Sequence, residues 1–167
     1  MIRRYKFAAF FLALAVSVTA QDIPQQLHGK WLIKRIVPTT TISCWSFKEA
    51  QRIVGTEIDY SANRLRWKDR VASDPLVEVS ELSAVEFQQE YSGGGANDSQ
   101  VNFGQLGIRS HSVTRIKLTH PDIKPIWGSY EIPGEEVLVK DKNTIIFSVC
   151  NVYFEARRES VSRASTK

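Results

Sequence analysis

The chain has 167 residues, of which 43% are hydrophobic, and it carries 22 Lys+Arg against 18 Asp+Glu, a net charge of +4. Three of these bases and no acid lie within the first 20 residues, so 22 minus 3 leaves 19 bases against 18 acids in the rest of the chain. This balance excludes a nucleic acid or an anionic membrane surface as the expected partner, because both need a clustered basic face. The apolar content is sufficient for the core of one domain.

The first 20 residues predict export. Arg3, Arg4 and Lys6 form a positive region, residues 7–18 form a short apolar run, and the small residue Ala20 ends the pattern. This is the pattern of a signal peptide cleaved near Ala20, which makes the mature protein secreted or periplasmic. The apolar run is short for a membrane span, and no cysteine follows the cleavage point. We therefore expect neither a stable membrane anchor nor a lipid anchor.

Residues 21–158 are expected to form a single domain, and the polar, Ser-rich residues 159–167 a disordered tail. The domain contains Cys44 and Cys150, and an even number of cysteines in an exported chain favours a disulfide over two buried thiols. The bridge would close a loop of 106 residues (150 − 44). Closing such a loop reduces the chain entropy of the unfolded state, which would stabilise the folded protein by about 4–5 kcal/mol. No metal site is expected, because two thiolates would need two further ligands.

The first half of the domain predicts three strands and a helix. A strand is predicted over Gly29–Ile36. Ser46 and Glu49 have the spacing of a capping box, which opens a short helix that ends at Gly55. The segments Thr56–Ser61 and Arg64–Lys68 alternate between polar and apolar residues and are expected to form a hairpin.

The second half predicts a helix and several strands. A strand over Leu76–Leu82 leads into a second capping box at Ser83, which starts a short helix through Tyr91. A flexible Gly-rich loop follows over residues 92–99. It contains Asn97 in a glycosylation sequon, which has meaning only in a eukaryotic host. The remaining strands are predicted over Ser112–Thr119, Ile126–Ile132, Glu136–Lys140 and Thr144–Arg157, with a tight turn at residues 141–143 between the last two.

The last predicted strand, Thr144–Arg157, is unusually long. It begins apolar on both faces and becomes polar on one, which is typical of a barrel wall that a helix covers in part. We expect the helix after Ser46 to be this cover. In total the sequence predicts a mainly β fold of roughly eight antiparallel strands, arranged as a barrel or a strongly bent sheet with one or two short helices.

Residues at the two ends of the domain resemble the calycin group, the lipocalins and their small-barrel relatives. Gly29-x-Trp31 opens the first strand, and Arg157 and Arg158 end the last one. In calycins a first-strand Trp packs under such an Arg at the closed end of the barrel. Arg158 is the expected partner of Trp31, because strand parity places it on the same face as Phe154.

The chain also departs from the lipocalin pattern. The Thr-Asp pair midway along the chain and the helix after the barrel are absent from the sequence, and a helix lies between the first two strands. The alternative to a calycin-like barrel is an unrelated antiparallel α+β domain in which Trp31 is an ordinary core residue.

The aromatic residues Tyr60, Trp67, Tyr130 and Phe154 fall on faces that we interpret as inward. They are expected to line a cavity for an apolar or aromatic ligand, with Trp31 and Arg158 closing its base. The alternative is that these side chains simply fill the interior, as in many small eight-stranded barrels.

The sequence offers no catalytic site and no cofactor site. His111 and His120 flank one predicted strand and would be roughly 30 Å apart, too far to share a metal. Glu135 follows a Pro-Gly turn and is interpreted as a solvated charge. The leading hypothesis is an exported, non-catalytic protein that holds an apolar small molecule in a calycin-like barrel. The alternatives are a protease-inhibitor-like or other protein-interaction module, acting through Gln21–Leu27, and an exported enzyme of unknown class.

Overall fold

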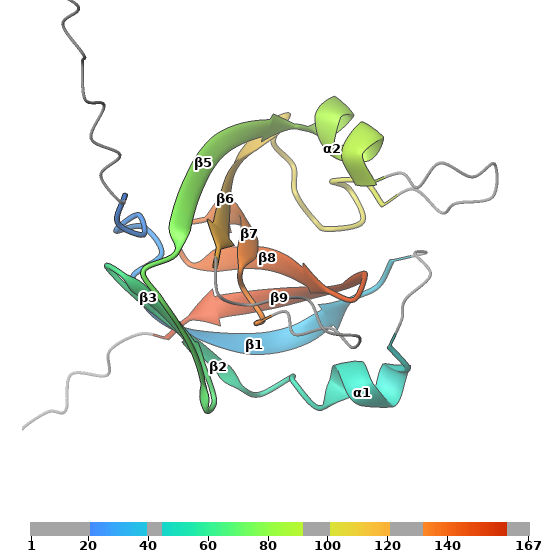
Figure 1. Ribbon diagram of the computed structural model, residues 1–167. Coiled ribbons are helices and arrows are strands. Elements are labelled where there is room, and N and C mark those ends of the chain that lie inside the picture. Colours follow the sequence, from blue (N-terminus) through green and yellow to red (C-terminus); the bar gives the residue numbers. More distant parts are fainter. Residues whose placement is uncertain (1–20, 40–44, 92–100, 121–131, 160–167) are drawn as a thin grey trace, which may run out of the picture.

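The computed structural model describes residues 21–39, 45–91, 101–120 and 132–159. These residues form a mainly β fold, in which one nine-stranded antiparallel sheet curls into a half-barrel and two short helices are attached to it (Figure 1). The predicted fold class is therefore confirmed. The predicted signal peptide, Cys44, Asn97, Tyr130 and residues 160–167 of the tail lie outside the described residues, as does the predicted strand Ile126–Ile132 except for its last residue.

The elements follow one another along the chain in a simple order. They are β1 (Gly29–Val37), α1 (Phe47–Gln51), β2 (Glu57–Ser61), β3 (Arg64–Trp67), β4 (Arg70–Ser73), β5 (Leu76–Ser83), α2 (Ala84–Tyr91), β6 (Ser112–Thr119), β7 (Glu136–Asp141), β8 (Thr144–Val149) and β9 (Val152–Arg158).

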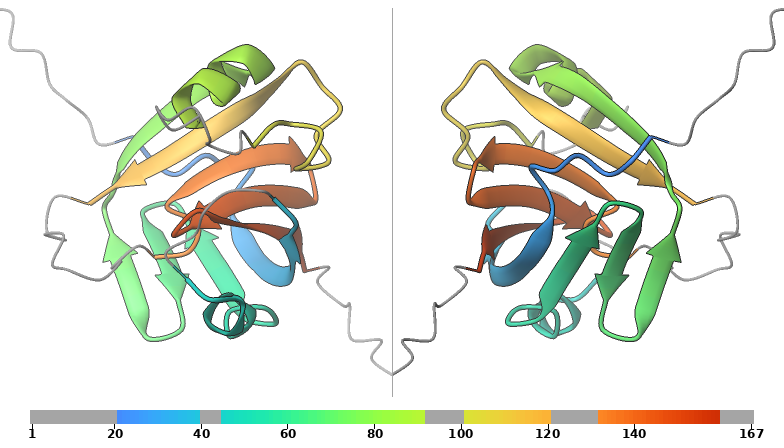
Figure 2. Two further views of the ribbon diagram at one scale, coloured as in Figure 1. Left: turned by 90° about the vertical axis from the view of Figure 1, so that its right-hand side faces the viewer. Right: turned by 90° about the vertical axis from the view of Figure 1, so that its left-hand side faces the viewer.

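The strand order in the sheet is β4-β3-β2-β1-β9-β8-β7-β6-β5, and every pair is antiparallel. Neighbours in the sheet are neighbours in sequence, except that β1 pairs with the last strand, β9. The edge strands β4 and β5 follow each other through Asp74 and Pro75, and β5 leads on from β4 around the curl (Figure 2). This is the order of an up-and-down barrel whose hydrogen-bonded ring is interrupted between β4 and β5.

Side-chain hydrogen bonds at their N-terminal ends determine where both helices begin. The Ser46 hydroxyl accepts a hydrogen bond from the Glu49 N–H at 3.3 Å, and the Glu49 carboxylate accepts one from the Ser46 N–H at 2.8 Å. Ser83 and Glu86 make the same pair of contacts, at 3.2 and 2.9 Å. Both predicted capping boxes are confirmed. The α1 helix ends at Gln51, earlier than predicted, and turns carry the chain on to β2.

The single strand predicted over Thr144–Arg157 is wrong, because this segment forms the two strands β8 and β9. Cys150 and Asn151 connect them and have φ angles of 53° and 61°. Two central residues with positive φ are the signature of a tight hairpin turn whose twist matches that of the strands. The chain therefore reverses where the sequence pattern predicts that it continues.

This reversal changes which side chains share a face of the sheet. Phe154 on β9 lies directly opposite Phe147 on β8 and shares its face, with the two rings stacked at 5.4 Å between centroids. An uninterrupted strand would have placed Phe154 with Ile146 instead. Ile146 in fact faces the other side of the sheet, together with Leu138 and Tyr153.

The sheet has apolar clusters on both faces. The inner cluster fills the curl and includes Trp31, Ile33, Ile58, Tyr60, Leu65, Ile116, Leu118, Val137, Ile145, Phe147, Phe154 and Ala156. The outer cluster is formed by Val37, Leu82, Phe87, Val101, Phe103, Leu106, Ile108, Val113, Leu138, Ile146 and Tyr153. Phe87 belongs to α2, so α2 and residues 101–108 cover β7–β9 from outside. The prediction that the helix after Ser46 is this cover is wrong, because Ala50 and Ile53 at that helix pack into the inner cluster.

Candidate functional site

Trp31 and Arg158 form the predicted contact at the junction of the first and last strands. They are directly opposite each other in the β1–β9 pair, and the Arg158 guanidinium lies 4.2 Å from the centre of the Trp31 ring. The guanidinium also donates hydrogen bonds to the carbonyl oxygens of His28 and Gln26. Arg158, and not Arg157, makes this contact, as strand parity predicts.

The segment before β1 is part of the same closed end. Ile23 and Leu27 are 1% and 0% exposed and belong to the inner cluster. The Trp31 indole N–H donates to the Leu27 carbonyl at 2.7 Å, and the Ile23 N–H donates to the carbonyl of Ala62 at 2.7 Å. These contacts attach the segment to the core through both its side chains and its backbone.

Tyr60 crosses the interior rather than lining an open space. Its side chain is 2% exposed, and its hydroxyl donates to the Gly134 carbonyl at 2.8 Å. Burial, and secondarily the negative charge of Glu135, raise the pKa of the Tyr60 hydroxyl well above its usual value. Tyr60 therefore stays neutral and links β2 to the residues just before β7.

Phe154 is likewise a filling residue. It is 0% exposed and stacks on Phe147, which is 2% exposed. A side chain with no accessible surface has no surface left to offer a ligand. Of the four aromatic residues predicted to line a cavity, Phe154 and Tyr60 thus match the alternative prediction, in which they fill the interior.

Trp67 differs from these residues because it is only partly buried. It packs on the edge of the inner cluster, and its indole N–H donates to the Thr56 hydroxyl at 2.9 Å. The Lys68 ammonium lies 4.6 Å from the centre of its ring. Trp67 is therefore held in place at the rim of the apolar interior.

Other inward-facing side chains near the interrupted edge of the sheet are also accessible. Val77 and Val79 on β5 lie opposite Leu118 and Ile116 on β6, so they share the inner face of the sheet. Val79 is 43% exposed, whereas Ile116 is 0% exposed. Trp67, Val77 and Val79 are inner-face apolar side chains that remain partly accessible to solvent at separate points of the sheet, and we refer to these three residues as the opening.

His120 and Glu135 form a polar pair that the sequence did not predict. His120 follows β6, and its side chain is 6% exposed. The His120 Nε2 lies 3.8 Å from Glu135 Oε1, and among the residues that the structure describes neither ring nitrogen has a hydrogen-bond partner. Burial lowers the pKa of His120, so the imidazole is neutral at pH 7. Alternate residues of a strand share a face, so the inward positions Ile116 and Leu118 were the signal that could have found His120.

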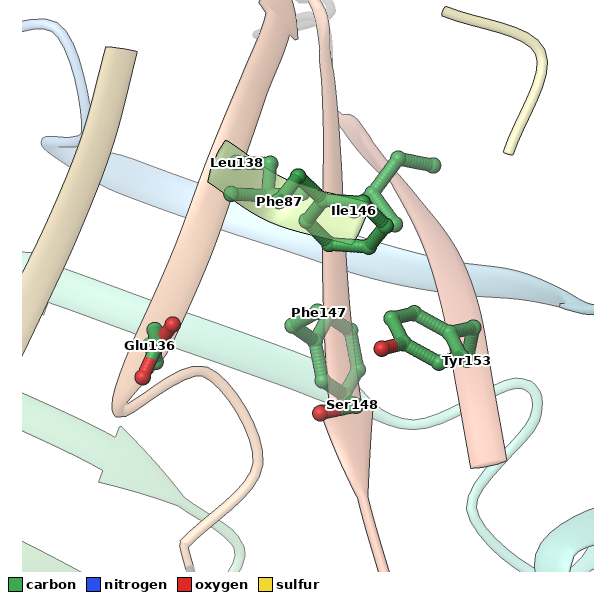
Figure 3. Close-up of a pocket in the computed structure, with 7 residues that line it drawn as sticks. All are labelled: Phe87, Glu136, Leu138, Ile146, Phe147, Ser148 and Tyr153. Carbon is green, nitrogen blue, oxygen red and sulfur yellow. The ribbon is translucent and has the colours of Figure 1, made fainter. Parts of the chain in front are cut away.

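A small pocket lies on the outer face of the sheet. It is lined by Phe87, Glu136, Leu138, Ile146, Phe147, Ser148 and Tyr153, with Phe87 from α2 lying next to Ile146 (Figure 3). Burial, and secondarily the charge of Glu136, raise the pKa of Tyr153 to about 12. The volume open to a water-sized sphere is about 10 Å³, roughly the space of one water molecule. This pocket is far too small for an organic ligand.

Glu155 on β9 is the centre of a charged cluster on the same outer face. Its side chain is 3% exposed and lies 2.8 Å from Arg35, 3.1 Å from Arg157 and 3.6 Å from Lys140. Burial alone would raise the pKa of Glu155. Hydrogen bonds from Arg35 and Arg157, together with the charges of Arg35 and Lys140, outweigh burial and hold this pKa below its usual value. The cluster joins β1, β7 and β9.

Within the described ranges, no three His, Cys, Asp or Glu side chains are grouped in a way that could hold a metal ion. Among those same residues, no helix is long and apolar enough to cross a membrane. Comparison of the chain with models of protein families, with curated proteins and with solved structures finds no match.

Proposed function

We propose that this protein is an exported, non-catalytic binding protein that holds an apolar small molecule at the inner face of its curled sheet. Calycins, which the sequence resembles at Gly29, Trp31 and Arg158, bind ligands in this manner. Three structural features support the proposal: the up-and-down strand order, the pairing of β1 with β9, and the Arg158–Trp31 stack.

The observation that carries the proposal is the change in exposure along the inner face. Ile116 is 0% exposed, while Val79 directly opposite it is 43% exposed. Trp67 is partly buried and is fixed by its hydrogen bond to Thr56. A ligand that covered the opening would bury this apolar surface and gain roughly 25 cal/mol per Å². Trp67 is therefore the binding residue that we retain from the sequence prediction, while Tyr60 and Phe154 support the site from within.

Export and a Cys44–Cys150 disulfide are part of the same proposal. The first 20 residues have the composition of a signal peptide, and an oxidising compartment would allow the bridge. Cys150 is 8% exposed, and Trp45, the residue after Cys44, packs against the cluster that contains Cys150. The bridge would attach the start of α1 to the β8–β9 turn. A mass about two units below that of the reduced chain would demonstrate it.

Native mass spectrometry of the protein purified after export is the direct test of binding. A bound mass that disappears on denaturation would identify the ligand, and its dissociation constant could then be measured for variants. We expect Trp67→Ala to weaken binding at least about tenfold, or 1.4 kcal/mol, with a smaller loss of stability. Val85→Ala is the matched control, because Val85 is 65% exposed on α2. Equal binding by wild type and Trp67→Ala would contradict the proposed site.

A second candidate function is a protein-interaction module, and the free edge of β5 favours it. Within the described part of the chain β5 pairs only with β6, and Leu76 on this edge strand is 56% exposed. An exposed apolar edge strand can accept a strand from a partner. Gln21–Leu27 is less suited to this role than the sequence suggested, because Ile23 and Leu27 are buried in the core.

Two substitutions separate the candidates. Leu76→Lys would prevent strand addition at β5 but leave binding of an apolar small molecule unchanged. Trp67→Ala should have the opposite effects. A protein partner whose binding Leu76→Lys abolishes, with no bound small molecule in the purified protein, would favour the second candidate.

A further inference from the structure

The structure marks the residue at which the packed domain begins. Ile23 is 1% exposed and belongs to the inner cluster, and its N–H donates to the Ala62 carbonyl at 2.7 Å. The two residues before it, Gln21 and Asp22, are exposed. The core contacts therefore start at Ile23, and Gln21 and Asp22 are accessible to solvent and to enzymes.

This boundary favours one cleavage point in the predicted signal peptide. Ala15 and Ala20 are both small residues of the kind that a signal peptidase recognises. Ala15 lies inside the apolar run of residues 7–18, whereas Ala20 follows the run and lies just ahead of the packed domain. Cleavage after Ala20 removes the whole apolar run and leaves every core residue in place. Gln21 then becomes the first residue of the exported chain.

A glutamine in the first position of a chain has a reaction open to it that an internal glutamine does not. Its free α-amine can attack the amide carbon of its own side chain and close a five-membered lactam. A C–N bond forms between the amine nitrogen and Cδ, and the bond between Cδ and Nε2 breaks. One amine hydrogen moves to the leaving nitrogen, so ammonia is released and no oxidant or other reactant is consumed. The product is pyroglutamate.

The surroundings of Gln21 suit this reaction. An exposed α-amine titrates close to neutral pH, so a substantial fraction of it is the uncharged nucleophile at pH 7. Gln21 is exposed, and the contacts that hold the segment begin only at Ile23. The amine can therefore reach its own side chain without breaking a contact of the core.

We propose that Gln21 is the first residue of the exported protein and is converted to pyroglutamate. This inference rests on the proposed export and goes beyond it, because it assigns a covalent modification to one residue. The lactam removes the charged terminal amine, which an aminopeptidase must bind. It therefore protects the short segment that leads to the core residue Ile23.

Mass spectrometry of the exported protein, reduced and analysed directly after collection, is the test. We expect a mass about 17 units, that of one ammonia, below the mass of a chain that starts at Gln21. Fragmentation should place this loss on the first residue. A free amine on Gln21, or a chain that starts at a different residue after cleavage, would overturn the inference but leave export intact. A chain that retains residues 1–20 would contradict export as well.

Three variants test the chemistry of the first residue. Gln21→Ala has no side-chain amide, so it should show a free amine and no loss of ammonia. Gln21→Glu should stay largely uncyclised under the same conditions, because a carboxylate is a much poorer acceptor for the amine than an amide. Gln25→Ala is the matched control, since Gln25 is also exposed but is internal, and it should keep the full loss of ammonia. The same loss in Gln21→Ala would place the modification elsewhere.

Digestion with an aminopeptidase connects the modification to the fold. The wild type should resist the enzyme. Gln21→Ala should lose its first two residues and then stop, because the Ile23 N–H is bonded to the Ala62 carbonyl and the Ile23 side chain is buried. Treatment of the wild type with pyroglutamyl aminopeptidase should make it behave like this variant. Equal trimming of the untreated wild type and the variant would show that the wild-type amine is free.

Discussion

The Tyr60 hydroxyl occupies the space that a side chain at Gly134 would need. Tyr60 donates a hydrogen bond of 2.8 Å to the Gly134 carbonyl, and Gly134 has a φ of +91°. A Cβ at this position would collide with the Tyr60 hydroxyl oxygen. The two residues are 74 positions apart in the chain, and their contact fixes β2 against the residues before β7.

Gly134→Ala should therefore destabilise the protein by about 2–4 kcal/mol, since it adds left-handed backbone strain to the displacement of Tyr60. Gly55→Ala is the matched control, because Gly55 has a φ of +85° and its added Cβ would meet nothing within 4 Å. Urea denaturation of both variants would measure their free energies of unfolding. The loss in Gly55→Ala reports backbone strain alone, and the additional loss in Gly134→Ala reports the collision with Tyr60. Equal losses in the two variants would mean that the Tyr60 contact adds nothing.

The Trp31–Arg158 stack should contribute strongly to stability. Arg158→Ala removes the cation–π contact and three hydrogen bonds to the carbonyl oxygens of Gln26, His28 and Lys142, so we expect a loss of about 2–4 kcal/mol. Arg66→Ala is the control, because its ion pair with Asp59 joins side chains that are 48% and 26% exposed, and exposed ion pairs contribute about 0–1 kcal/mol. Thermal unfolding monitored by near-UV circular dichroism would compare the two variants. A smaller loss for Arg158→Ala than for Arg66→Ala would contradict this account of the closed end.

The buried Glu155 carboxylate should make the protein sensitive to acid. Its pKa is held below the usual value of 4.5 in the folded state, so its contribution to stability is present above pH 4.5 and is lost as the pH falls through the folded pKa. Glu155→Gln should cost about 1–3 kcal/mol at pH 7 and flatten this dependence. Glu57→Gln, in the exposed 3.2 Å pair with Lys30, should have little effect at either pH. Urea midpoints at pH 7 and pH 3.5 are the measurement.

His120 should produce a second pH dependence in a higher range. Burial lowers its folded pKa below 6.5, so the unfolded chain takes up the proton first and stability falls as the pH drops below 6.5. His120→Leu should remove this component and should be more stable than the wild type at pH 5.5. The difference between the two denaturation curves cancels the contributions of the other histidines. A difference that does not change between pH 7.5 and pH 5.5 would contradict the burial of a neutral imidazole.

The sequence predicted those elements whose signals are local. Alternation of polar and apolar residues identified β2 and β3, and two capping boxes located the starts of both helices. The Trp31–Arg158 contact was also predicted, although it joins distant residues, because strand parity and a family resemblance both indicated it. In each case a short pattern carried enough information to specify the structure.

The prediction failed where the chain reverses without a strong turn signal. Cys150 does not break the pattern of apolar residues along this segment, so the residues on either side of it were predicted to form one strand. Asn151 was the available clue, since asparagine tolerates positive φ better than most residues. The four-residue strand β4 was missed for a similar reason, because Asp69 and Asp74 bracket a segment too short to show a clear period.

The candidate site was harder to predict than the fold. Whether an inward aromatic residue fills or lines an interior depends on the distance between opposite walls, which the sequence does not encode locally. Tyr60 meets Gly134 across the curl and is buried, whereas Trp67 at the rim is not. The sequence analysis considered His120 and Glu135 one at a time and assigned neither a site. Their side chains lie close together only because the end of β6 is aligned with the residues before β7.

The pairing of β1 with β9 has a consequence for how the chain folds. The Arg158 guanidinium and the His28 carbonyl that it bonds are 130 residues apart, so one side of β1 stays without its strand partner until the final residues of the domain have emerged from the ribosome. Contacts between such distant segments form slowly, since a long loop must close before they yield any stabilisation. The protein should therefore complete its native sheet only after β9 has been synthesised. A chain truncated before Val152 would leave one edge of β1 and Trp31 exposed, which favours aggregation.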